Sequence, residues 1–479
     1  MARASLIATL IAPPSPDGTE LTALPDSVEW LEVRADLLGD IDPEWVRSHF
    51  RGRLLYSLRT HEAPDRQQRL KAAARFYDRI ELETDTDLSD ELFQQIPSEK
   101  RLLAWYGQAS ELSELNDRFE QISAVPASVY KLVSTATTIA EEFLPLSLLK
   151  SLKRTDTIAF STGSLGFWNR LVALQLGSPA IFGLAGSGSI VDMEPSIGKL
   201  INDYQLPELN SVKETFAIIG NPIFHSLSPR LHNASYRSMN HPALFVPLRV
   251  SSFAEFWREF VLSRKLDSLG MPINGMTVSS PHKEEALLKA KTVSALARQS
   301  EAANILVRNN GWWDADTTDP DVIYTASRDR SVRVKEKRAA VIGCGGAGRA
   351  IAAALVESGA GVTLINRGAE RGEHAATLLG LPYMPLRDFD ADGYDIVVNA
   401  TPVGRDTDEV PFKVEQLNDG AVVIDLVYGS RPTPLVDTTR ARQQIAIDGR
   451  DVLVTQVRHQ FRLVTGKDMP AALAREVLK

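Results

Sequence analysis

The sequence predicts an α/β protein made of an N-terminal (β/α)8 barrel followed by a two-lobed unit that contains a dinucleotide-binding domain. Three observations lead to this prediction: a length of 479 residues, eight apolar strand-like runs before residue 190, and a glycine-rich turn near residue 345. A chain of this length is too long for one hydrophobic core and fits two or three domains.

Composition and charge narrow the class of protein. Hydrophobic residues make up 44% of the chain and charged residues 24%, which is ordinary for a globular protein with large cores. The net charge of -8 argues against a general nucleic-acid binder. No apolar run approaches the ~20 residues of a membrane span, and the N-terminus lacks the pattern of a secretion signal. The single cysteine, Cys344, excludes an intrachain disulfide and a cysteine-rich zinc site, so we expect a cytoplasmic protein with no metal site.

Strand-like and helix-like stretches alternate through the first ~200 residues, as in the helix-like stretch 67–76. The strand-like runs are residues 6–12, 28–34, 54–59, 79–83, 102–106, 129–134, 157–161 and 180–184. Eight such runs predict a (β/α)8 barrel, and an open doubly wound sheet is the alternative.

Charged residues stand at the ends of several predicted barrel strands. They are Glu32, Arg34, Arg59, Glu83 and Lys131. Barrel enzymes collect their catalytic groups at the C-terminal ends of the strands. Lys131 is flanked by apolar and small residues, and burial lowers the pKa of a lysine and leaves a nucleophilic amine that can form an imine with a ketone. A solvated surface lysine is the alternative.

The N-terminal segment, roughly residues 5–190, resembles type I 3-dehydroquinate dehydratase. The similar motifs are Glu32-Val-Arg34-Ala-Asp36, Ser57-Leu-Arg59-Thr, Ile80-Glu-Leu-Glu83, Tyr130-Lys131-Leu and the segment 163–171. The resemblance implies that Lys131 forms a Schiff base with the substrate ketone. It also implies that Arg59 and Arg170 contact the carboxylate or hydroxyls and that Glu32 and Arg34 position the substrate.

The segment also departs from that family. The family's fifth strand ends in Ser-x-His, and the sequence has Gly107 where the histidine belongs. Ala63 stands at the position of a family glutamate, and Gly186-Ser-Gly-Ser-Ile replaces a Pro-Gly-Gln motif. Imine formation is compatible with these changes, whereas proton abstraction lacks its usual base.

Only two histidines, His49 and His61, precede residue 200. His49 lies in the helix-like stretch 44–50 and is interpreted as a surface or packing residue. His61 directly follows the third strand, and one hypothesis is that it supplies the missing imidazole from a neighbouring loop. An inactive or weakened barrel site is the alternative.

A linker-like stretch covers residues ~190–214, and a new strand at 215–220 opens the second half of the chain. Two hydroxyls, Ser226 and Ser228, follow this strand closely. Taken alone, the Ser-Leu-Ser-Pro segment is most simply a helix N-cap.

A glycine-rich turn lies between a predicted strand at 338–342 and a predicted helix at 346–357. Small residues allow a pyrophosphate to approach the backbone, and the N-terminus of a helix favours its negative charge. This strand, turn and helix therefore predict a dinucleotide-binding domain.

The next strand, 361–365, indicates which dinucleotide is bound. It ends in Asn366 and Arg367, roughly where an acidic residue would bind the ribose 2′-hydroxyl of NAD. A guanidinium at this point suits the 2′-phosphate of NADP. We therefore expect NADP as the cofactor, with a surface arginine as the alternative.

From Gly220 onward the sequence is similar to shikimate dehydrogenase in the order and spacing of its motifs. These motifs are the segments 275–283, 302–306, 316–319, 341–350, 399–404 and 424–428, together with Gln456. The resemblance implies that Lys283 and Asp319 are the catalytic pair. The implied substrate contacts are Ser226, Ser228, Thr277, Ser279, Asn304, Tyr428 and Gln456, and the implied cofactor contacts are Gly343, Gly345, Gly346, Ala347, Asn366, Arg367 and Thr401. Thr277 and Thr317 each replace a family asparagine.

The predicted chemistry explains these residue types. Reduction of a ring ketone needs a hydride from the nicotinamide and a proton for the developing alkoxide, which an ammonium held by a carboxylate can supply. Neutral hydroxyl and amide side chains suit the recognition of a polyol.

The two resemblances together imply a fusion of two enzymes that act on 3-dehydroquinate, 3-dehydroshikimate and shikimate. The expected domains are a barrel at 1–205, a substrate-binding domain at 214–330 completed by helices at 450–479, and an NADP-binding domain at 335–449. One alternative is that the reductase acts on quinate or that it alone is active. Another is a regulatory homologue without catalysis. The sequence leaves the oligomeric state open.

Overall fold

The computed structural model describes residues 2–59, 65–186, 194–329, 332–405, 407–429 and 431–478. The chain forms two compact units, and the boundary between them runs through strand β11 (Glu214–Gly220). Unit 1 contains residues 1–216 and 222–273. Unit 2 contains residues 217–221 and 274–479.

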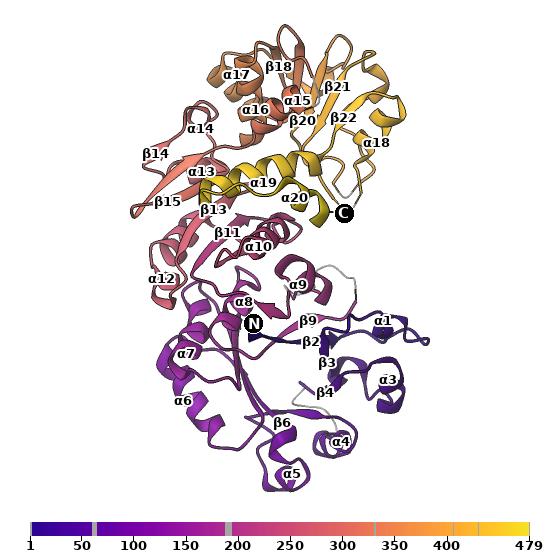
Figure 1. The fold of residues 1–479 in the computed structure, drawn as a ribbon, viewed down its shortest axis with the longest axis vertical. Coiled ribbons are helices and arrows are strands. Elements are labelled where there is room, and N and C mark those ends of the chain that lie inside the picture. Colours follow the sequence, from indigo (N-terminus) through magenta and orange to yellow (C-terminus); the bar gives the residue numbers. More distant parts are fainter. Residues whose placement is uncertain are drawn as a thin grey trace. The chain divides into compact units, whose positions relative to one another are not determined.

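Eight parallel strands form a barrel in unit 1 (Figure 1). They are β2 (Ser5–Leu10), β3 (Val28–Arg34), β4 (Arg53–Ser57), β5 (Arg79–Glu83), β6 (Arg101–Gly107), β7 (Val129–Thr135), β8 (Thr157–Thr162) and β9 (Ala180–Leu184). They are neighbours in the order β8-β7-β6-β5-β4-β3-β2-β9, and every pair is parallel. Each predicted run overlaps one of these strands, so the predicted barrel is confirmed.

Helices connect the strands of the barrel. They are α1 (Thr19–Thr22), α2 (Ala35–Leu38), α3 (Pro43–His49), α4 (Arg66–Ala73), α5 (Asp90–Gln95), α6 (Leu112–Ser123), α7 (Leu144–Leu152) and α8 (Trp168–Gln175), with α9 (Ile197–Tyr204) after the last strand and short 3-10 turns η1 (Ser98–Lys100) and η2 (Glu141–Phe143). Two short strands, β1 (Ala2–Arg3) and β10 (Glu208–Leu209), pair antiparallel. The start of α3 follows ordinary capping chemistry, because Asp42 accepts a hydrogen bond from the Glu44 amide and proline occupies the first turn.

Alternate residues of each strand fill the interior of the barrel with apolar side chains. On β6 the inward-facing residues are Leu102, Ala104 and Tyr106, which belong to one cluster with residues of the other strands. Trp105 faces the surrounding helices, where the Arg118 guanidinium of α6 lies 5.8 Å from its ring. This alternation decides which side chains at the strand ends reach the barrel pocket.

The segment 222–273 belongs to unit 1 and packs on the barrel helices. It contains α10 (Ser228–Ser238), β12 (Ala243–Arg249), α11 (Phe253–Phe256), the π-helical turn η3 (Trp257–Val261) and α12 (Lys265–Leu269). The Phe260 ring lies 5.3 Å from Phe143 and 5.1 Å from Trp168. The Arg249 amide donates to the Leu165 carbonyl at 3.0 Å. This part of the second half therefore shares an apolar core with the barrel.

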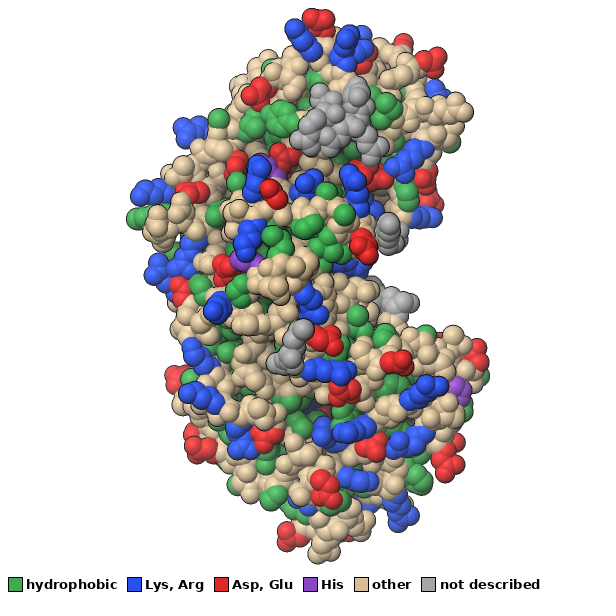
Figure 2. All heavy atoms as spheres, in the orientation of Figure 1, with side chains coloured by type: hydrophobic (Ala, Val, Ile, Leu, Met, Phe, Trp, Pro, Cys, Tyr) green, Lys and Arg blue, Asp and Glu red, His purple; other side chains and the backbone are tan. Residues whose placement is uncertain are grey.

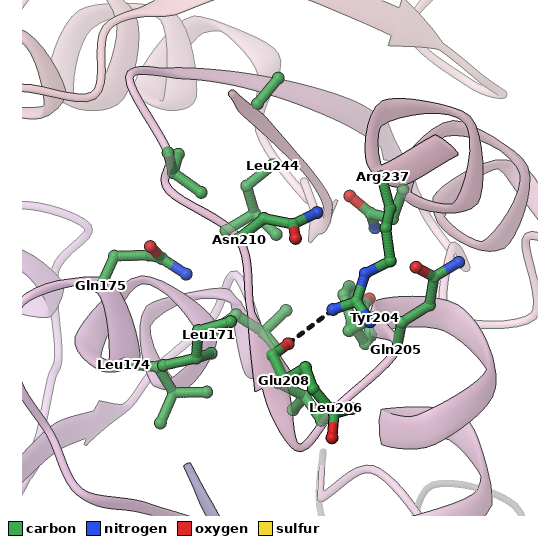
Figure 3. A pocket seen from close by; sticks show the side chains of 14 residues that line it. Leu171, Leu174, Gln175, Tyr204, Gln205, Leu206, Glu208, Asn210, Arg237 and Leu244 are labelled. Carbon is green, nitrogen blue, oxygen red and sulfur yellow. Dashed lines mark hydrogen bonds between the residues drawn. The ribbon is translucent and has the colours of Figure 1, made fainter. Parts of the chain in front are cut away.

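A small pocket of about 40 Å³ lies within unit 1, between α8, α9, α10 and the linker that follows α9 (Figure 3). Leucines form one side of it, and Arg237 donates to the Glu208 carbonyl at 2.6 Å on the other. Three of the lining side chains, Tyr204, Gln205 and Arg237, carry buried polar atoms with no hydrogen-bond partner. None of the residues expected from the sequence to act in a site lines this pocket.

Unit 2 begins with a sheet that carries several of the predicted site residues. Its strands β13 (Ile273–Val278), β15 (Ile305–Asn309), β16 (Trp312–Asp316) and β14 (Thr292–Val293) are neighbours in that order. Helices α13 (Lys283–Leu287), α14 (Ala295–Gln299) and α15 (Asp321–Asp329) connect or follow these strands.

A second sheet in unit 2 has six parallel strands in the order β19-β18-β17-β20-β21-β22. The strands are β17 (Arg338–Ile342), β18 (Gly361–Asn366), β19 (Tyr383–Pro385), β20 (Ile396–Asn399), β21 (Val422–Asp425) and β22 (Ile445–Ile447), and the helices are α16 (Gly346–Glu357), α17 (Ala369–Leu379), α18 (Pro434–Ala441), α19 (Gly449–Thr465) and α20 (Ala471–Val477), with 3-10 turns η4 (Leu386–Asp388) and η5 (Val414–Gln416). Val341 and Ile342 point into separate apolar clusters. The sheet is therefore buried on both faces, as expected for a parallel α/β domain.

On the face drawn in Figure 2, basic and acidic side chains are interspersed. Within the described ranges, every helix is too short or too polar to cross a membrane.

Candidate active sites

The barrel contains a cavity of about 320 Å³ at the C-terminal ends of its strands. Its lining is Arg59, Glu83, Tyr106, Lys131, Val133, Thr135, Phe160, Thr162, Arg170, Phe182 and Glu194. Four of the charged residues expected from the sequence, Arg59, Glu83, Lys131 and Arg170, thus lie around one cavity.

Lys131 is the most buried basic group in this pocket, with 1% of its surface exposed. Its Nζ atom lies 2.9 Å from Oε2 of Glu81. The same atom is 4.3 Å from the ring centre of Phe182 and 5.3 Å from that of Tyr106. Burial, assisted by the nearby Arg59 charge, lowers the pKa of Lys131, which favours the neutral amine that an imine-forming lysine needs.

Glu81 joins three groups of the pocket through its two oxygens. Besides Lys131, it accepts a hydrogen bond of 2.7 Å from the Tyr106 hydroxyl and one of 3.2 Å from Nε of Arg59. Burial alone would raise the pKa of this carboxyl, but the ion pairs with Lys131 and Arg59 lower it to about 2. At rest Glu81 is therefore ionised, and because burial raises the pKa of Tyr106 well above its usual value, the phenol carries its proton.

Glu32 is fully buried and lies behind the pocket wall. It accepts hydrogen bonds from Thr9 at 2.7 Å, Ser57 at 2.7 Å and Arg59 at 2.5 Å. Because both of its oxygens accept hydrogen bonds from neighbouring side chains, its geometry is that of a group that orients Arg59.

Arg34 forms a bidentate ion pair with Asp36, with N···O distances of 2.9 and 2.6 Å. The side chain does not line the cavity. Arg170 does, and its Nη1 atom is 2.7 Å from Oε1 of Glu194. The pocket therefore contains two guanidinium groups, from Arg59 and Arg170, and each is paired with a carboxylate of the protein.

At the end of β6 the residue that faces the pocket is Tyr106. A Cβ atom added to Gly107 would lie 2.3 Å from the Trp105 ring, which faces the helices. A side chain at position 107 would thus point away from the cavity. His49 packs on Trp45 at 4.5 Å, as its predicted packing role requires, and His61 lies outside the described residues.

In unit 2, the Lys283 ammonium lies 2.6 Å from Oδ2 of Asp319. Lys283 opens α13, and Asp319 follows β16. The other carboxylate oxygen of Asp319 accepts hydrogen bonds from Asn304 at 2.9 Å and Gln456 at 3.0 Å. Only 4% of the Asp319 side chain is exposed, against 18% for Lys283, so the lysine is the accessible member of the pair.

A network of amide and hydroxyl side chains surrounds the residues that hold the Lys283–Asp319 pair. Asn304 also accepts a bond from the Thr318 amide at 2.9 Å. Gln460 of α19 donates to the Thr318 hydroxyl at 3.0 Å and accepts from Thr277 at 3.3 Å. Three predicted substrate contacts, Thr277, Asn304 and Gln456, are thereby brought to the Lys283 pair.

The glycine-rich turn leads from β17 into α16 with the predicted bounds. Gly343 has a φ of 103°, a left-handed conformation that favours glycine. A Cβ on Gly348 would meet the Gly343 carbonyl at 1.8 Å, whereas nothing lies within 4 Å of a Cβ on Gly345. The turn is thus closed on one side by its own backbone and open at Gly345, where a ligand can approach.

The turn lies next to the lysine. A Cβ on Gly346 would be 3.4 Å from the Lys283 side chain. Arg349 of α16 binds Glu284 at 2.8 Å and the Ser300 carbonyl at 2.8 Å. These bonds fix the dinucleotide helix against α13 and keep Lys283 beside the turn.

At the end of β18, Asn366 accepts a hydrogen bond from the Cys344 amide at 3.2 Å and donates to the Gly368 carbonyl at 2.8 Å. The adjacent Arg367 is exposed. Thr401 donates to Asn399 at 2.6 Å and approaches Gly343. The predicted cofactor residues of three strands therefore lie at one edge of this sheet.

The remaining predicted contacts are spread over the two units. Ser226 and Ser228 are buried in unit 1, where the Ser226 hydroxyl accepts from the Ser228 amide at 3.2 Å. The N-cap residue of α10 is Leu227, and the helix start has no side-chain cap, so the N-cap alternative is not confirmed. Ser279 and Tyr428 are half-buried in unit 2.

Both halves of the chain match known protein families. Residues 218–306 match the model of the shikimate dehydrogenase substrate binding domain, and residues 338–429 match a model described as NADP oxidoreductase, coenzyme F420-dependent. The NADP(+) shikimate dehydrogenase of Ignicoccus hospitalis is 35% identical over 242 residues, which cover 50% of this chain and 89% of that protein. The chain belongs to the shikimate dehydrogenase family.

The shikimate dehydrogenase half is fused to a type I 3-dehydroquinase domain, whose family model matches residues 19–200. A chloroplastic bifunctional 3-dehydroquinate dehydratase/shikimate dehydrogenase of Arabidopsis thaliana is 27% identical over 395 residues, or 78% of this chain and 64% of that protein. The crystal structure of a Thermus thermophilus shikimate 5-dehydrogenase with NADP(H) and shikimate is 28% identical, with a TM-score of 0.50 over 55% of this chain and 98% of that one.

Five residues around these sites were not expected from the sequence: Glu81, Tyr106, Glu194, Thr318 and Gln460. The alternation of β5 and β6 was the available signal for Glu81 and Tyr106. For Glu194 and Gln460 the sequence offers no local signal, because each partner is far away along the chain.

Proposed function

We propose that this protein catalyses two successive reactions, the dehydration of 3-dehydroquinate to 3-dehydroshikimate in the barrel and the NADPH-dependent reduction of 3-dehydroshikimate to shikimate in the second half. The observation that carries the reductase is the Lys283–Asp319 pair beside the Gly346 turn. The Arabidopsis relative is named for both activities.

In the reductase, Lys283 and Asp319 are the proposed catalytic pair. Lys283 donates a proton to the oxygen of the substrate ketone as it becomes an alkoxide, and Asp319 holds the ammonium in place. Asn304 and Gln456 fix the carboxylate so that it keeps one oxygen for the lysine. NADPH, when bound, supplies the hydride.

The residues present fit this cofactor. Gly345 leaves open space for a pyrophosphate at the N-terminus of the twelve-residue helix α16. We assign Gly343, Gly345, Gly346, Ala347, Asn366 and Thr401 to the dinucleotide. Arg367 is exposed next to the end of β18, where its guanidinium can bind the 2′-phosphate of NADP.

The proposed substrate contacts are Ser226, Ser228, Thr277, Ser279, Asn304, Tyr428 and Gln456. The Thr317 hydroxyl is buried and has no hydrogen-bond partner. This free hydroxyl supports the proposal that a polar substrate binds here. The proposed functional domains are residues 1–205, 214–330 with 450–479, and 335–449.

In the barrel, Lys131 is the proposed imine former, Arg59 and Arg170 bind the substrate carboxylate or hydroxyls, and Glu32 positions the substrate through its bond to Arg59. Arg34 is bidentate to Asp36 and does not line the cavity, so its predicted part in positioning the substrate is indirect. Burial, the lowered pKa and the two neighbouring rings support this role for Lys131. These residues do not include the proton-transferring histidine of the family, and His61 stays a hypothesis for that role. Cytoplasmic location likewise stays a prediction.

Two assays test the proposal. Reduction of NADP by shikimate, followed at 340 nm, is expected for the wild type and lost in Lys283→Ala, and quinate in the same assay tests the alternative substrate. Borohydride treatment with 3-dehydroquinate is expected to add the reduced substrate to Lys131, as measured by peptide mass. A chain inactive in both assays would be the non-catalytic regulatory homologue, and one active only with shikimate would have a degenerate barrel.

A further inference from the structure

The strand end where the family carries its histidine is filled by a different proton-carrying group. Side chains on β6 alternate, and Tyr106 enters the cavity that contains Lys131. A side chain at position 107 would require the Trp105 ring to move, because this ring lies 2.3 Å from the place of its Cβ. The residue able to act on a ligand from this strand is therefore a tyrosine.

The Tyr106 hydroxyl is connected to the amine through one carboxylate. It donates to Oε1 of Glu81 at 2.7 Å, and Lys131 donates to Oε2 of Glu81 at 2.9 Å. Both donor–acceptor distances in this series of hydrogen bonds are within hydrogen-bonding range. A proton released by Lys131 thus has a continuous path to the phenol oxygen.

Arg59 fixes the tyrosine in this position. Its guanidinium lies 5.2 Å from the centre of the Tyr106 ring, and its Nε atom is 3.2 Å from Glu81. Tyr106 is consequently held by a cation–π contact on its face and a hydrogen bond at its hydroxyl. Such double restraint is what a group needs to meet a substrate with a defined geometry.

We propose that Tyr106, with Glu81 as its positioning partner, moves protons at the imine of Lys131 in place of the family's histidine. The inference rests on the proposed dehydratase function of the barrel. It assigns to a described side chain of the pocket wall the role that the other hypothesis gives to His61.

The first step is the condensation of the amine with the substrate ketone. The carbon–nitrogen bond forms as the carbonyl carbon–oxygen bond breaks. The Lys131 ammonium brings three hydrogens, the protonated imine keeps one, and two leave with the carbonyl oxygen as water. Glu81 accepts these protons from the lysine, and Tyr106 delivers them to the oxygen while recovering its own proton from Glu81.

The second step is loss of water from the ring. The Tyr106 oxygen takes the proton from the carbon next to the imine as its own proton moves to Glu81, and the electron pair of that C–H bond moves into the imine to give an enamine. The hydroxyl on the next carbon then leaves with its bonding pair. The returning proton from Tyr106 makes it water, and the carbon–carbon double bond of the product forms. A water molecule equivalent to the one lost in the first step then adds to the product imine, which breaks its carbon–nitrogen bond and restores the Lys131 ammonium and the product ketone. No oxidant is needed.

Tyr106→Phe is the test, because it removes the hydroxyl and keeps the ring that packs under Arg59. Dehydration of 3-dehydroquinate, followed by the ultraviolet absorbance of the conjugated product, is expected to fall by about 10²- to 10⁴-fold. Borohydride trapping on Lys131 after a long incubation is expected to persist. Shikimate oxidation by the same sample shows that the chain is folded.

Tyr56→Phe is the matched control. Tyr56 is also a buried tyrosine on a barrel strand whose hydroxyl donates to a carboxylate, Asp40, at 2.6 Å, but it does not line the cavity. Its dehydration rate is expected to match the wild type. Glu81→Gln keeps the size of the positioning residue, and it is expected to slow both trapping and dehydration, whereas a purely structural role would leave trapping unchanged.

The outcomes separate the relay from the activity on which it rests. Wild-type dehydration that survives Tyr106→Phe would overturn the relay and leave the dehydratase standing, most clearly if His61→Ala abolished the rate instead. Absence of dehydration by the wild type would overturn both proposals for the barrel. A loss confined to Tyr106→Phe and Glu81→Gln would support the relay.

Discussion

Lys283 and Asp319 lie 36 positions apart in the sequence and meet at 2.6 Å, and the stem of the lysine lies against Gly346 of the dinucleotide turn. The proposed proton donor and the glycine-rich turn are thus adjacent within one unit of the fold. This proximity is the geometric requirement for coupling hydride transfer to protonation of the same carbonyl group.

Lys283→Ala and Asp319→Asn are expected to lower kcat for shikimate oxidation by about 10²- to 10⁴-fold with little change in the KM for NADP. The lysine variant loses the proton donor, and the asparagine variant loses the charge that orients it. Steady-state kinetics at saturating shikimate measures this. A rate within threefold of wild type for either variant would contradict the assigned pair.

Two glycine variants separate cofactor binding from stability. In Gly345→Ala the new methyl group meets no protein atom, so Tm is expected to stay unchanged while NADP affinity falls. In Gly348→Ala the methyl group collides with the Gly343 carbonyl at 1.8 Å, so Tm is expected to fall by several degrees. Thermal unfolding without cofactor and NADP titration measure the two effects, and equal Tm losses would refute the distinction.

Arg367→Ala is expected to weaken NADP binding by about 10- to 100-fold and to leave NAD binding nearly unchanged, because a charge-assisted hydrogen bond contributes about 1.5–3 kcal/mol. Dissociation constants for both dinucleotides test this. Arg387→Ala, which removes a similarly exposed arginine that lies 3.6 Å from Asp388, is the control. An unchanged preference for NADP would show that Arg367 is an ordinary surface residue.

Glu142 predicts a pH dependence of stability. Burial raises the pKa of this carboxyl from 4.5 to about 7, although Leu165 and Trp168 donate to it. The folded state therefore holds a proton that the unfolded state releases, so this contribution is complete below pH 4.5 and is lost as the pH rises to about 7. The change amounts to about 3 kcal/mol.

Urea unfolding at pH 5 and pH 8, followed by tryptophan fluorescence, measures this dependence. Glu142→Gln cannot titrate and is expected to remove most of the difference between the two pH values, even though its overall stability is lower. If the free energy of unfolding changed equally between pH 5 and pH 8 in the variant and the wild type, the pH dependence would belong to other groups.

A histidine introduced at position 106 is expected to have a different effect from one introduced at position 107. Tyr106→His is expected to place an imidazole in the barrel cavity and retain dehydration, with a new pH dependence near the histidine pKa of about 6.5. Gly107→His is expected to destabilise the chain by about 1–3 kcal/mol, because Trp105 must move. Dehydration rates across pH 5–8 and urea unfolding decide between these positions.

Much of the architecture could be predicted because its signals are local. The β17 strand, the glycine turn and α16 have the predicted bounds, since one apolar run, one set of glycines and one helical pattern define them. Barrel strands were predicted to within a few residues, for the same reason. Arg367 and Lys283 likewise stand in recognisable local motifs.

What could not be predicted depends on pairing between distant segments. Lys131 and Glu81 are 50 positions apart, and nothing in either segment indicates that they form an ion pair. Whether Tyr106 or Gly107 reaches the cavity depends on the phase of β6, which a one-residue shift would reverse. Arg34 was expected to position the substrate, yet its guanidinium is bidentate to Asp36 and does not line the cavity.

The packing of Phe260 on Phe143 and Trp168 has a consequence for any division of the chain into two proteins. If the gene were divided within the segment after α9, each product would expose these aromatic side chains to solvent and would be prone to aggregate. Separate versions of the two halves would need more polar residues at these positions to stay dispersed in water. Dividing this chain would therefore require several coordinated substitutions in addition to a new chain end.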